Sequence, residues 1–168
     1  MYIKSQNDVL LNSIQKYFDE NGEDYNKMVE IINKKSIISL RIIDFFITNY
    51  SKNNKIKIGD FYIHQEYKNQ LKGYHKSKFD PFCRKLKDKK DTSIKFEHKN
   101  GIIEMTTIGQ LNLFRWVLKN GIIDYIENNY YQIDQELNKK TRINNKSKKI
   151  SLITEKKDEN TFVVSGLL

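Results

Sequence analysis

The sequence predicts a mainly helical α+β fold, with a compact helical core, one β-hairpin and a basic C-terminal tail. Apolar residues recur at spacings of three and four along most of the chain, as on amphipathic helices. A short alternating stretch interrupted by Asn100-Gly101 is typical of one hairpin, near residues 93–106. With 168 residues, we expect a single mostly helical domain over residues 1–138 and a basic tail with an apolar end over 139–168.

The first third of the chain is predicted to contain three helices. The apolar spacing indicates one helix over residues 9–18 and another over Tyr25–Lys35, and Ser36 is the expected N-cap of the third. That third helix, Ile37–Tyr50, is apolar almost all round, so we expect it to be the central element of the core. Its β-branched residues also allow a strand, but the length of the run favours a helix.

The middle of the chain is predicted to contain a short strand, a helix and an ordered turn. Lys55–Ile58 alternates as a strand does, and Gly59-Asp60 ends it. A helix is predicted over Phe61–Tyr74. Pro81 fixes its own φ and biases the preceding residue to an extended form, so Phe79–Phe82 should be an ordered turn.

The hairpin and two further helices complete the prediction. Asn100 and Gly101 tolerate positive φ and are expected in a type I′ turn. Thr107 and Gln110 match a capping box that starts a helix over Ile108–Lys119, where Asn120-Gly121 provides the stop. A last helix is predicted up to Leu137. Beyond it no apolar period continues, so we expect a mobile basic tail.

Charge is concentrated in two segments of this chain, whose formal net charge is +9. Lys72–Lys90 carries eight Lys/Arg and two Asp, and Lys139–Ile150 carries six Lys/Arg and no acid. The rest of the chain is therefore net acidic, and a polyanion is the first partner class to consider. The alternative is that lysines simply decorate a solvated surface.

The predicted nucleic-acid-binding residues are the cations of these two segments together with Tyr74. Tyr74, Phe79 and Phe82 interleave with the cations, so they either stack on exposed bases or fix the segment to the core, and we favour the second role for the two Phe. The candidates are Lys72, Tyr74, Lys76, Lys78, Arg84, Lys85, Lys87, Lys89, Lys90, Lys139, Lys140, Arg142, Lys146, Lys148 and Lys149.

No catalytic residue, metal ligand or cofactor site is predicted. Cys83 is the single cysteine, which excludes an intrachain disulfide and suits a reducing compartment. His64, His75 and His98 lack the i, i+4 spacing of a helical zinc pair, and the glycines lack nucleotide-loop spacing. No apolar stretch approaches the roughly 20 residues that a membrane span needs, so no membrane partner is expected.

Two motifs carry a resemblance to a known family. Phe79-Asp80-Pro81-Phe82-Cys83-Arg84, followed by Thr107-Ile108-Gly109-Gln110-Leu111-Asn112-Leu113-Phe114-Arg115-Trp116, resembles a small uncharacterised protein family of nucleocytoplasmic large DNA viruses. Residues 40–50 are similar too, so the resemblance covers roughly residues 40–130. It implies a viral origin, with a viral factory in the host cytoplasm or a virion core as the setting, and supplies no catalytic residues.

We therefore expect a non-enzymatic viral protein that binds DNA or RNA with weak sequence preference. The alternative is a structural or adaptor protein that docks on a larger viral assembly, with viral transcription or virion proteins as partners, through its apolar C-terminus and aromatic surface. A nuclease ranks third, because it would need a convergence of acidic residues. The acids to watch are Asp44, Glu66, Asp80 and Glu97.

Overall fold

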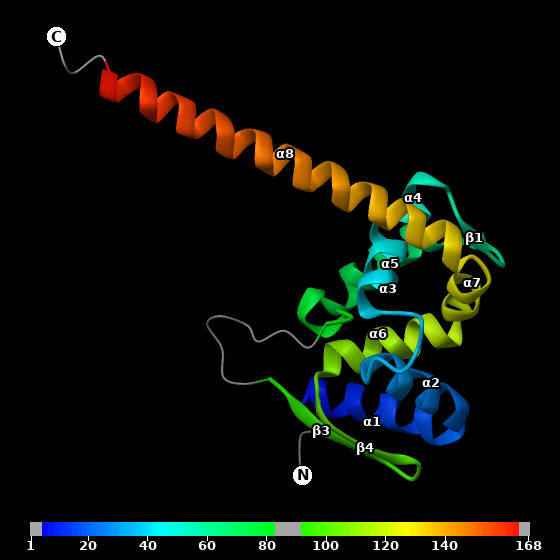
Figure 1. Cartoon of the computed structure of the whole chain (residues 1–168). Helices are drawn as coiled ribbons and strands as arrows, with labels where there is room; N and C mark the ends of the chain where they lie inside the picture. Colours follow the sequence, from blue (N-terminus) through cyan, green and yellow to red (C-terminus); the bar gives the residue numbers. More distant parts are fainter. Residues whose placement is uncertain (1–4, 83–91, 165–168) are drawn as a thin grey trace. The chain divides into compact units, whose positions relative to one another are not determined.

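The computed structural model describes residues 5–82 and 92–164, with side chains described as far as residue 152 (Figure 1). The chain divides into two compact units, Met1–Tyr130 and Tyr131–Leu168. The domain boundary predicted after residue 138 falls inside the long helix of the second unit, because it was placed where the apolar period stops. The fold class is confirmed: the described chain is mainly helical, with two small antiparallel strand pairs.

The N-terminal pair of helices is α1 (Gln6–Glu20) and α2 (Gly22–Ile32). Helix α1 starts with a reciprocal capping box, in which the Ser5 side chain accepts from the Asp8 amide and the Asp8 carboxylate accepts from the Ser5 amide. Most of the inward-facing apolar residues of both helices are buried as their spacing predicts, but Val9, the first residue of that spacing, is 57% exposed. The buried residues are Ile14, Phe18, Tyr25, Met28 and Ile31.

The apolar run after α2 is helical, as its length indicated, but begins later than predicted. It forms α3 (Leu40–Phe45), a π-helical segment η1 (Phe46–Tyr50) and a short α4 (Ser51–Asn53). Its N-cap is Ser39, whose hydroxyl accepts from the Ile42 amide at 3.2 Å, and not Ser36. Ser36 instead accepts from the Ile38 amide two residues on, which forms a local turn ahead of the helix.

Two short strands, β1 (Lys57–Ile58) and β2 (Phe61–Tyr62), precede α5 (Ile63–Tyr74). The strands pair in an antiparallel manner, with Gly59 at a positive φ of 56° in the link between them. Helix α5 ends near Gly73, as predicted. A single 3₁₀ turn, η2 (Lys76–Lys78), follows it.

The predicted hairpin is confirmed, with β3 (Ile94–His98) paired to β4 (Gly101–Thr106) in antiparallel register. Its turn differs from the type I′ prediction. His98 pairs with Gly101, so Lys99 and Asn100 occupy the two turn positions. The positive φ lies at Gly101, at 151°, because the His98 Nδ1 atom accepts from the Asn100 amide and fixes a different turn.

Helix α6 (Ile108–Lys119) is the most enclosed element of the first unit, with nine of its twelve residues buried. We had expected Ile37–Tyr50 to be the central element. That segment is also part of the core, but α6 packs against α1, α2, α7 and η2 (Figure 1). Gly121, at a φ of 67°, separates α6 from α7 (Ile122–Asn128), as the Asn120-Gly121 pair predicted.

The expected last helix and irregular tail are both corrected by the structure. Helix α7 ends at Asn128, and a new helix, α8 (Tyr130–Val164, yellow to red in Figure 1), runs through the basic segment. A segment without an apolar period has no face to bury, but its residues can still favour a helix. Residues 122–165 contain no Gly or Pro and are rich in Lys, which favours helix. No helix among the described residues is long and apolar enough to span a membrane.

Candidate nucleic-acid interface

The turn that carries the first basic segment is held on the N-terminal end of α6 by three hydrogen bonds. The Asn112 side-chain amide donates to the Lys78 carbonyl at 3.0 Å, and the Gln110 side-chain amide donates to the Pro81 carbonyl at 2.9 Å. The Asp80 amide donates to the Gly109 carbonyl at 3.3 Å. Residues 78–81 are therefore fixed to α6 through their backbone groups.

A close approach of two backbones accompanies these bonds. A Cβ atom added at Gly109 would lie 2.7 Å from the Ser77 carbonyl oxygen and 3.3 Å from the Phe79 amide nitrogen. Only glycine fits here without displacing main-chain atoms, so the 3₁₀ turn can rest directly on the first turn of α6.

The buried ring of Phe79 also holds this turn in place, through contacts with the core. It is 1% exposed, and its ring centroid lies 5.5 Å from that of Trp116 and 5.9 Å from that of Tyr67. The Tyr74 ring stacks on Phe79 at 6.2 Å with an interplanar angle of 10°. Phe79 thus has the core role favoured above, and Tyr74 is half-buried against it instead of standing free for a base.

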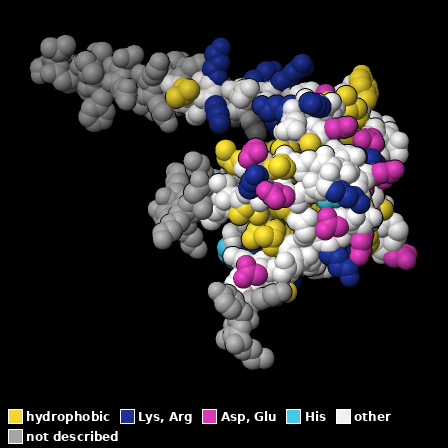
Figure 2. Space-filling model, turned by 90° about the horizontal axis from the view of Figure 1, so that it is seen from below, with side chains coloured by type: hydrophobic (Ala, Val, Ile, Leu, Met, Phe, Trp, Pro, Cys, Tyr) yellow, Lys and Arg dark blue, Asp and Glu magenta, His cyan; other side chains and the backbone are white. Residues whose placement is uncertain are grey.

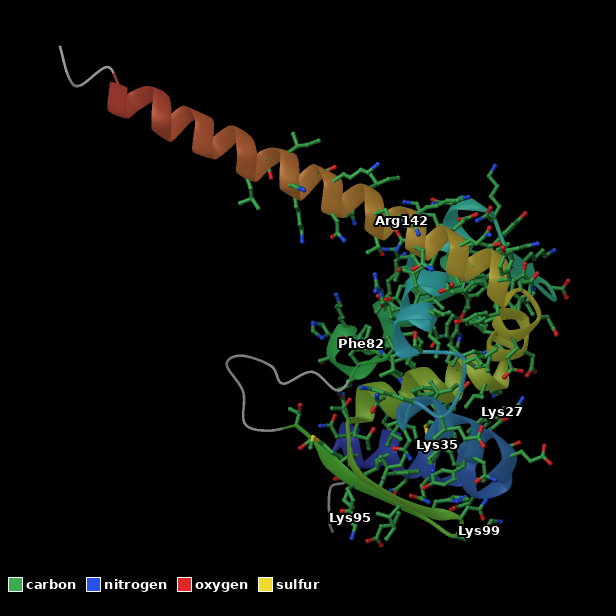
Figure 3. All side chains as sticks on the ribbon, viewed as in Figure 1. Lys27, Lys35, Phe82, Lys95, Lys99 and Arg142 are labelled. Atoms are coloured by element: carbon green, nitrogen blue, oxygen red, sulfur yellow. The ribbon has the colours of Figure 1, made fainter. Side chains whose placement is uncertain are left out.

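The ordered turn predicted around Pro81 is confirmed. The Asp80 carboxylate accepts from the Phe82 amide at 2.9 Å, which closes a local Asx turn. Pro81 is buried and Phe82, labelled in Figure 3, is half-buried.

The described cations of this segment lie around the fixed turn. Lys72, in the last turn of α5, and Lys76 are exposed, while Lys78 is half-buried. The other five predicted cations lie outside the described residues. They are Arg84, Lys85, Lys87, Lys89 and Lys90.

The second basic segment, Lys139–Ile150, is helical, and the helix places several of its cations on one side, which the sequence alone did not predict. All six of its predicted cations are exposed on α8. At 3.6 residues per turn, four of them fall within an arc of about 80°. We call this set the α8 basic stripe: Lys139, Arg142, Lys146 and Lys149. Lys140 and Lys148 lie on other faces of the helix. The i, i+3, i+7, i+10 spacing was legible in the sequence, but it carries meaning only once the segment is helical.

Several cations of the first unit have partners. Lys27 binds Asp124 at 2.8 Å, Lys95 binds Glu97 at 3.2 Å, and Lys99 donates to the Asp19 carbonyl at 3.3 Å. Among the described residues, the stripe cations form no ion pair. Figure 2 shows Lys and Arg side chains gathered along α8, whereas both signs of charge are interspersed over the rest of that face. Arg142 is labelled in Figure 3.

An open cleft of about 520 Å³ lies at α1, β2, α5 and α6 of the first unit. Its cations are Lys16, Arg115 and Lys119, and its carboxylates are Glu20 and Glu66. The Arg115 guanidinium is held by bonds to Ser13 at 2.8 Å and Asn112 at 2.7 Å. Because both signs of charge line the cleft and Arg115 is bound to neighbouring side chains, we interpret these residues as structural and not as a binding site.

Tyr17 also lines the cleft, and its hydroxyl donates to the Asp24 carboxylate. Burial, followed by this hydrogen bond, raises the pKa of the Tyr17 phenol well above its usual value. The phenol therefore stays protonated near neutral pH and is unsuited to act as a general base.

The acidic residues that a nuclease would use do not form a metal site in the described part of the chain. No group of three or more His, Cys, Asp or Glu side chains that could hold a metal ion occurs among these residues. Glu66 instead accepts hydrogen bonds from Gln70 and Asn69 on its own helix. The buried His98 ring contacts the Phe18 carbonyl at 3.0 Å and stacks on Tyr25.

Comparison with known proteins gives a family for this fold. Residues 2–165 match a family model described as Family of unknown function (DUF7197). The chain belongs to this family. It is similar to Uncharacterized protein L507 of Acanthamoeba polyphaga mimivirus, with 40% identity over 150 residues, or 84% of this chain and 58% of that protein. The chain thus spans less than two thirds of that relative's length. No solved structure matches it.

The DUF7197 match confirms the expected family at a coarse level, as an uncharacterised family represented in a large DNA virus. The two motifs that carried the resemblance are the two sides of one contact. Pro81 belongs to the first motif and Lys78 directly precedes it, while Gly109, Gln110 and Asn112 belong to the second. Sequence reasoning assigned Gln110 to a capping box and gave Gly109 and Asn112 no role.

Proposed function

We propose that this protein binds nucleic acid without an enzymatic step, through phosphate contacts and with weak sequence preference. The observation that carries the proposal is the α8 basic stripe, because clustered exposed cations without acidic partners release counterions when they neutralise phosphates. Residues 139–152 include six cations and no acid. The end of α5 and the fixed turn that follows it supply a second group, Lys72, Lys76 and Lys78.

We also propose that the protein acts where viral nucleic acid is concentrated, in the viral factory of the host cytoplasm or in the virion core.

Salt titration of two charge-matched variants tests the proposal. In the stripe variant, four changes remove the stripe charge: Lys139→Gln, Arg142→Gln, Lys146→Gln and Lys149→Gln. In the control variant, four exposed lysines of the first unit are changed: Lys35→Gln, Lys52→Gln, Lys57→Gln and Lys68→Gln. Both lose four charges, and exposed changes usually alter stability by only about 0.5 kcal/mol each.

The slope of log affinity against log salt should decrease by about 3 to 4 in the stripe variant, since each phosphate contact on duplex DNA contributes about 0.9. The control slope should change much less. The proposal fails if the unmodified protein binds neither duplex nor single strand at low salt, or if both variants lose the same slope.

An adaptor function is the second candidate, and one observation favours it. Ile143, Ile150 and Leu152 are 63%, 64% and 58% exposed on α8. Such side chains suit a protein partner. If the protein is an adaptor, changing Ile143 and Ile150 to Gln should abolish its binding to protein partners. If it binds nucleic acid, the same changes should leave the salt dependence of its nucleic-acid affinity unchanged.

A further inference from the structure

We propose that the nucleic acid bound by α8 is double-stranded DNA, contacted along its phosphates by a continuous helix. This inference rests on the proposed function and names its substrate class. It comes from two observations, the helical spacing of the cations and the position of the aromatic rings.

The aromatic rings argue against a single strand. Proteins that bind single strands combine a basic groove with aromatic side chains on which successive bases stack. Residues 139–152 contain no aromatic residue, and the exposed ring of Tyr131 lies on α8 more than two turns before Lys139. In the turn that rests on α6, Phe79 is buried and the half-buried Tyr74 is stacked on it, so these two rings are already packed. The described cations are thus suited to phosphates without base stacking.

The dimensions of the stripe suit a duplex. From Lys139 to Lys149 the helix rises about 15 Å, at about 1.5 Å per residue. Duplex DNA carries one charge per about 1.7 Å of axis, so about nine phosphates lie along that length. A single strand offers about half as many. Even with Lys140 left out, the five other cations of the segment outnumber the phosphates that one strand offers over this length, whereas a duplex has enough for all of them.

The width of helix α8 favours DNA over duplex RNA as the bound duplex. An α-helix with side chains is about 10–12 Å wide, and the major groove of B-form DNA, about 12 Å wide, admits it. The deep, narrow major groove of an A-form helix does not. Lys140 and Lys148, which lie on other faces than the stripe, can then reach phosphates on the opposite wall of the groove.

The test uses the full chain and three labelled probes of one sequence: duplex DNA, single-stranded DNA and duplex RNA. Affinities are measured by fluorescence anisotropy at about 50 and about 200 mM salt, the range over which phosphate contacts are most visible. We expect duplex DNA to bind at least about tenfold more tightly than either competitor at equal salt.

A second pair of variants asks whether the helix matters apart from its charges. Ser147→Pro interrupts α8 within the stripe and keeps every cation, because proline removes an amide and clashes with the preceding turn. Ser147→Ala is the matched control, since it loses only the hydroxyl bond to the Ile143 carbonyl. We expect the proline variant to lose most of its preference for duplex DNA and the alanine variant to keep it.

The outcomes separate this inference from the proposed function. Equal or tighter binding of single-stranded DNA or of duplex RNA overturns the inference and leaves nucleic-acid binding in place. A proline variant that keeps the full preference for duplex DNA also overturns it. If no probe binds at low salt, the proposed function fails first.

Discussion

Replacing Gly109 by alanine tests how tightly the basic turn rests on α6. The added Cβ would lie 2.7 Å from the Ser77 carbonyl oxygen, a separation that Cβ atoms essentially never show, and its other neighbours are also backbone atoms. Either the turn or the first turn of α6 must move. Overpacking of this kind costs about 1–3 kcal/mol.

Gly73→Ala is the matched control. Gly73 also lies in a helix, α5, and an added Cβ there would meet nothing within 4 Å. Alanine is favoured over glycine in helices by up to about 1 kcal/mol, and this gain applies roughly equally to both sites. The difference in unfolding free energy between the two variants therefore isolates the clash, and we expect it to be about 1–3 kcal/mol.

Urea unfolding followed by tryptophan fluorescence measures this difference. Trp116 is the single tryptophan and its ring lies 5.5 Å from that of Phe79, so its emission reports on the packing of the turn. The Gly109 variant should show a shifted native spectrum and a lower unfolding midpoint. If Gly109→Ala is as stable as Gly73→Ala, the turn does not rest on α6 as described.

Two more substitutions test buried polar groups. Gln110→Leu should destabilise the protein by about 1–3 kcal/mol in urea unfolding, because it leaves the Pro81 carbonyl and the Thr106 hydroxyl without their partner; an unchanged midpoint would contradict the role of Gln110. Tyr25→Phe should leave stability unchanged or raise it by less than about 1 kcal/mol, since the buried Tyr25 hydroxyl has no hydrogen-bond partner among the described residues. A loss above about 1 kcal/mol in the same assay would show that this hydroxyl is paired.

Local patterns predicted the helices well because each one depends on contacts within a few residues. The apolar spacing located α1, α2, α5 and α6, and the Thr107 hydroxyl accepts from the Gln110 amide at 3.1 Å, as a cap should. The Asn120-Gly121 pair ended α6 for the same reason, because a left-handed residue is a local requirement.

The contacts that hold the basic turn could not be predicted in this way. Gln110 fits a capping box, yet its side chain accepts from the Thr106 hydroxyl and donates to Pro81, which is 29 positions away. No periodicity encodes such a partner. Gly109 is equally uninformative alone, because its need for a bare Cα arises only when the Ser77 backbone arrives beside it.

The tail was misjudged for a different physical reason. A missing apolar period shows that no face of a segment is buried, and we took that as a sign of irregular structure. Helix formation also depends on propensity, and a stretch rich in Lys without Gly or Pro retains it. For a segment whose proposed partner is a polyanion, the informative period is that of the charges, here Lys139, Arg142, Lys146 and Lys149.

The position of the rings decides between the two roles that the sequence left open for the first basic segment. Tyr74 and Phe79 among lysines allow base stacking, as in many single-strand binders, or a role in the core, which the sequence favoured for Phe79. In the fold, Phe79 lies among Tyr67, Tyr74 and Trp116, so its ring serves the core and the nearby lysines keep only their charge. A surface that offers charge without rings distinguishes its partners by phosphate density, and that density is highest on a duplex.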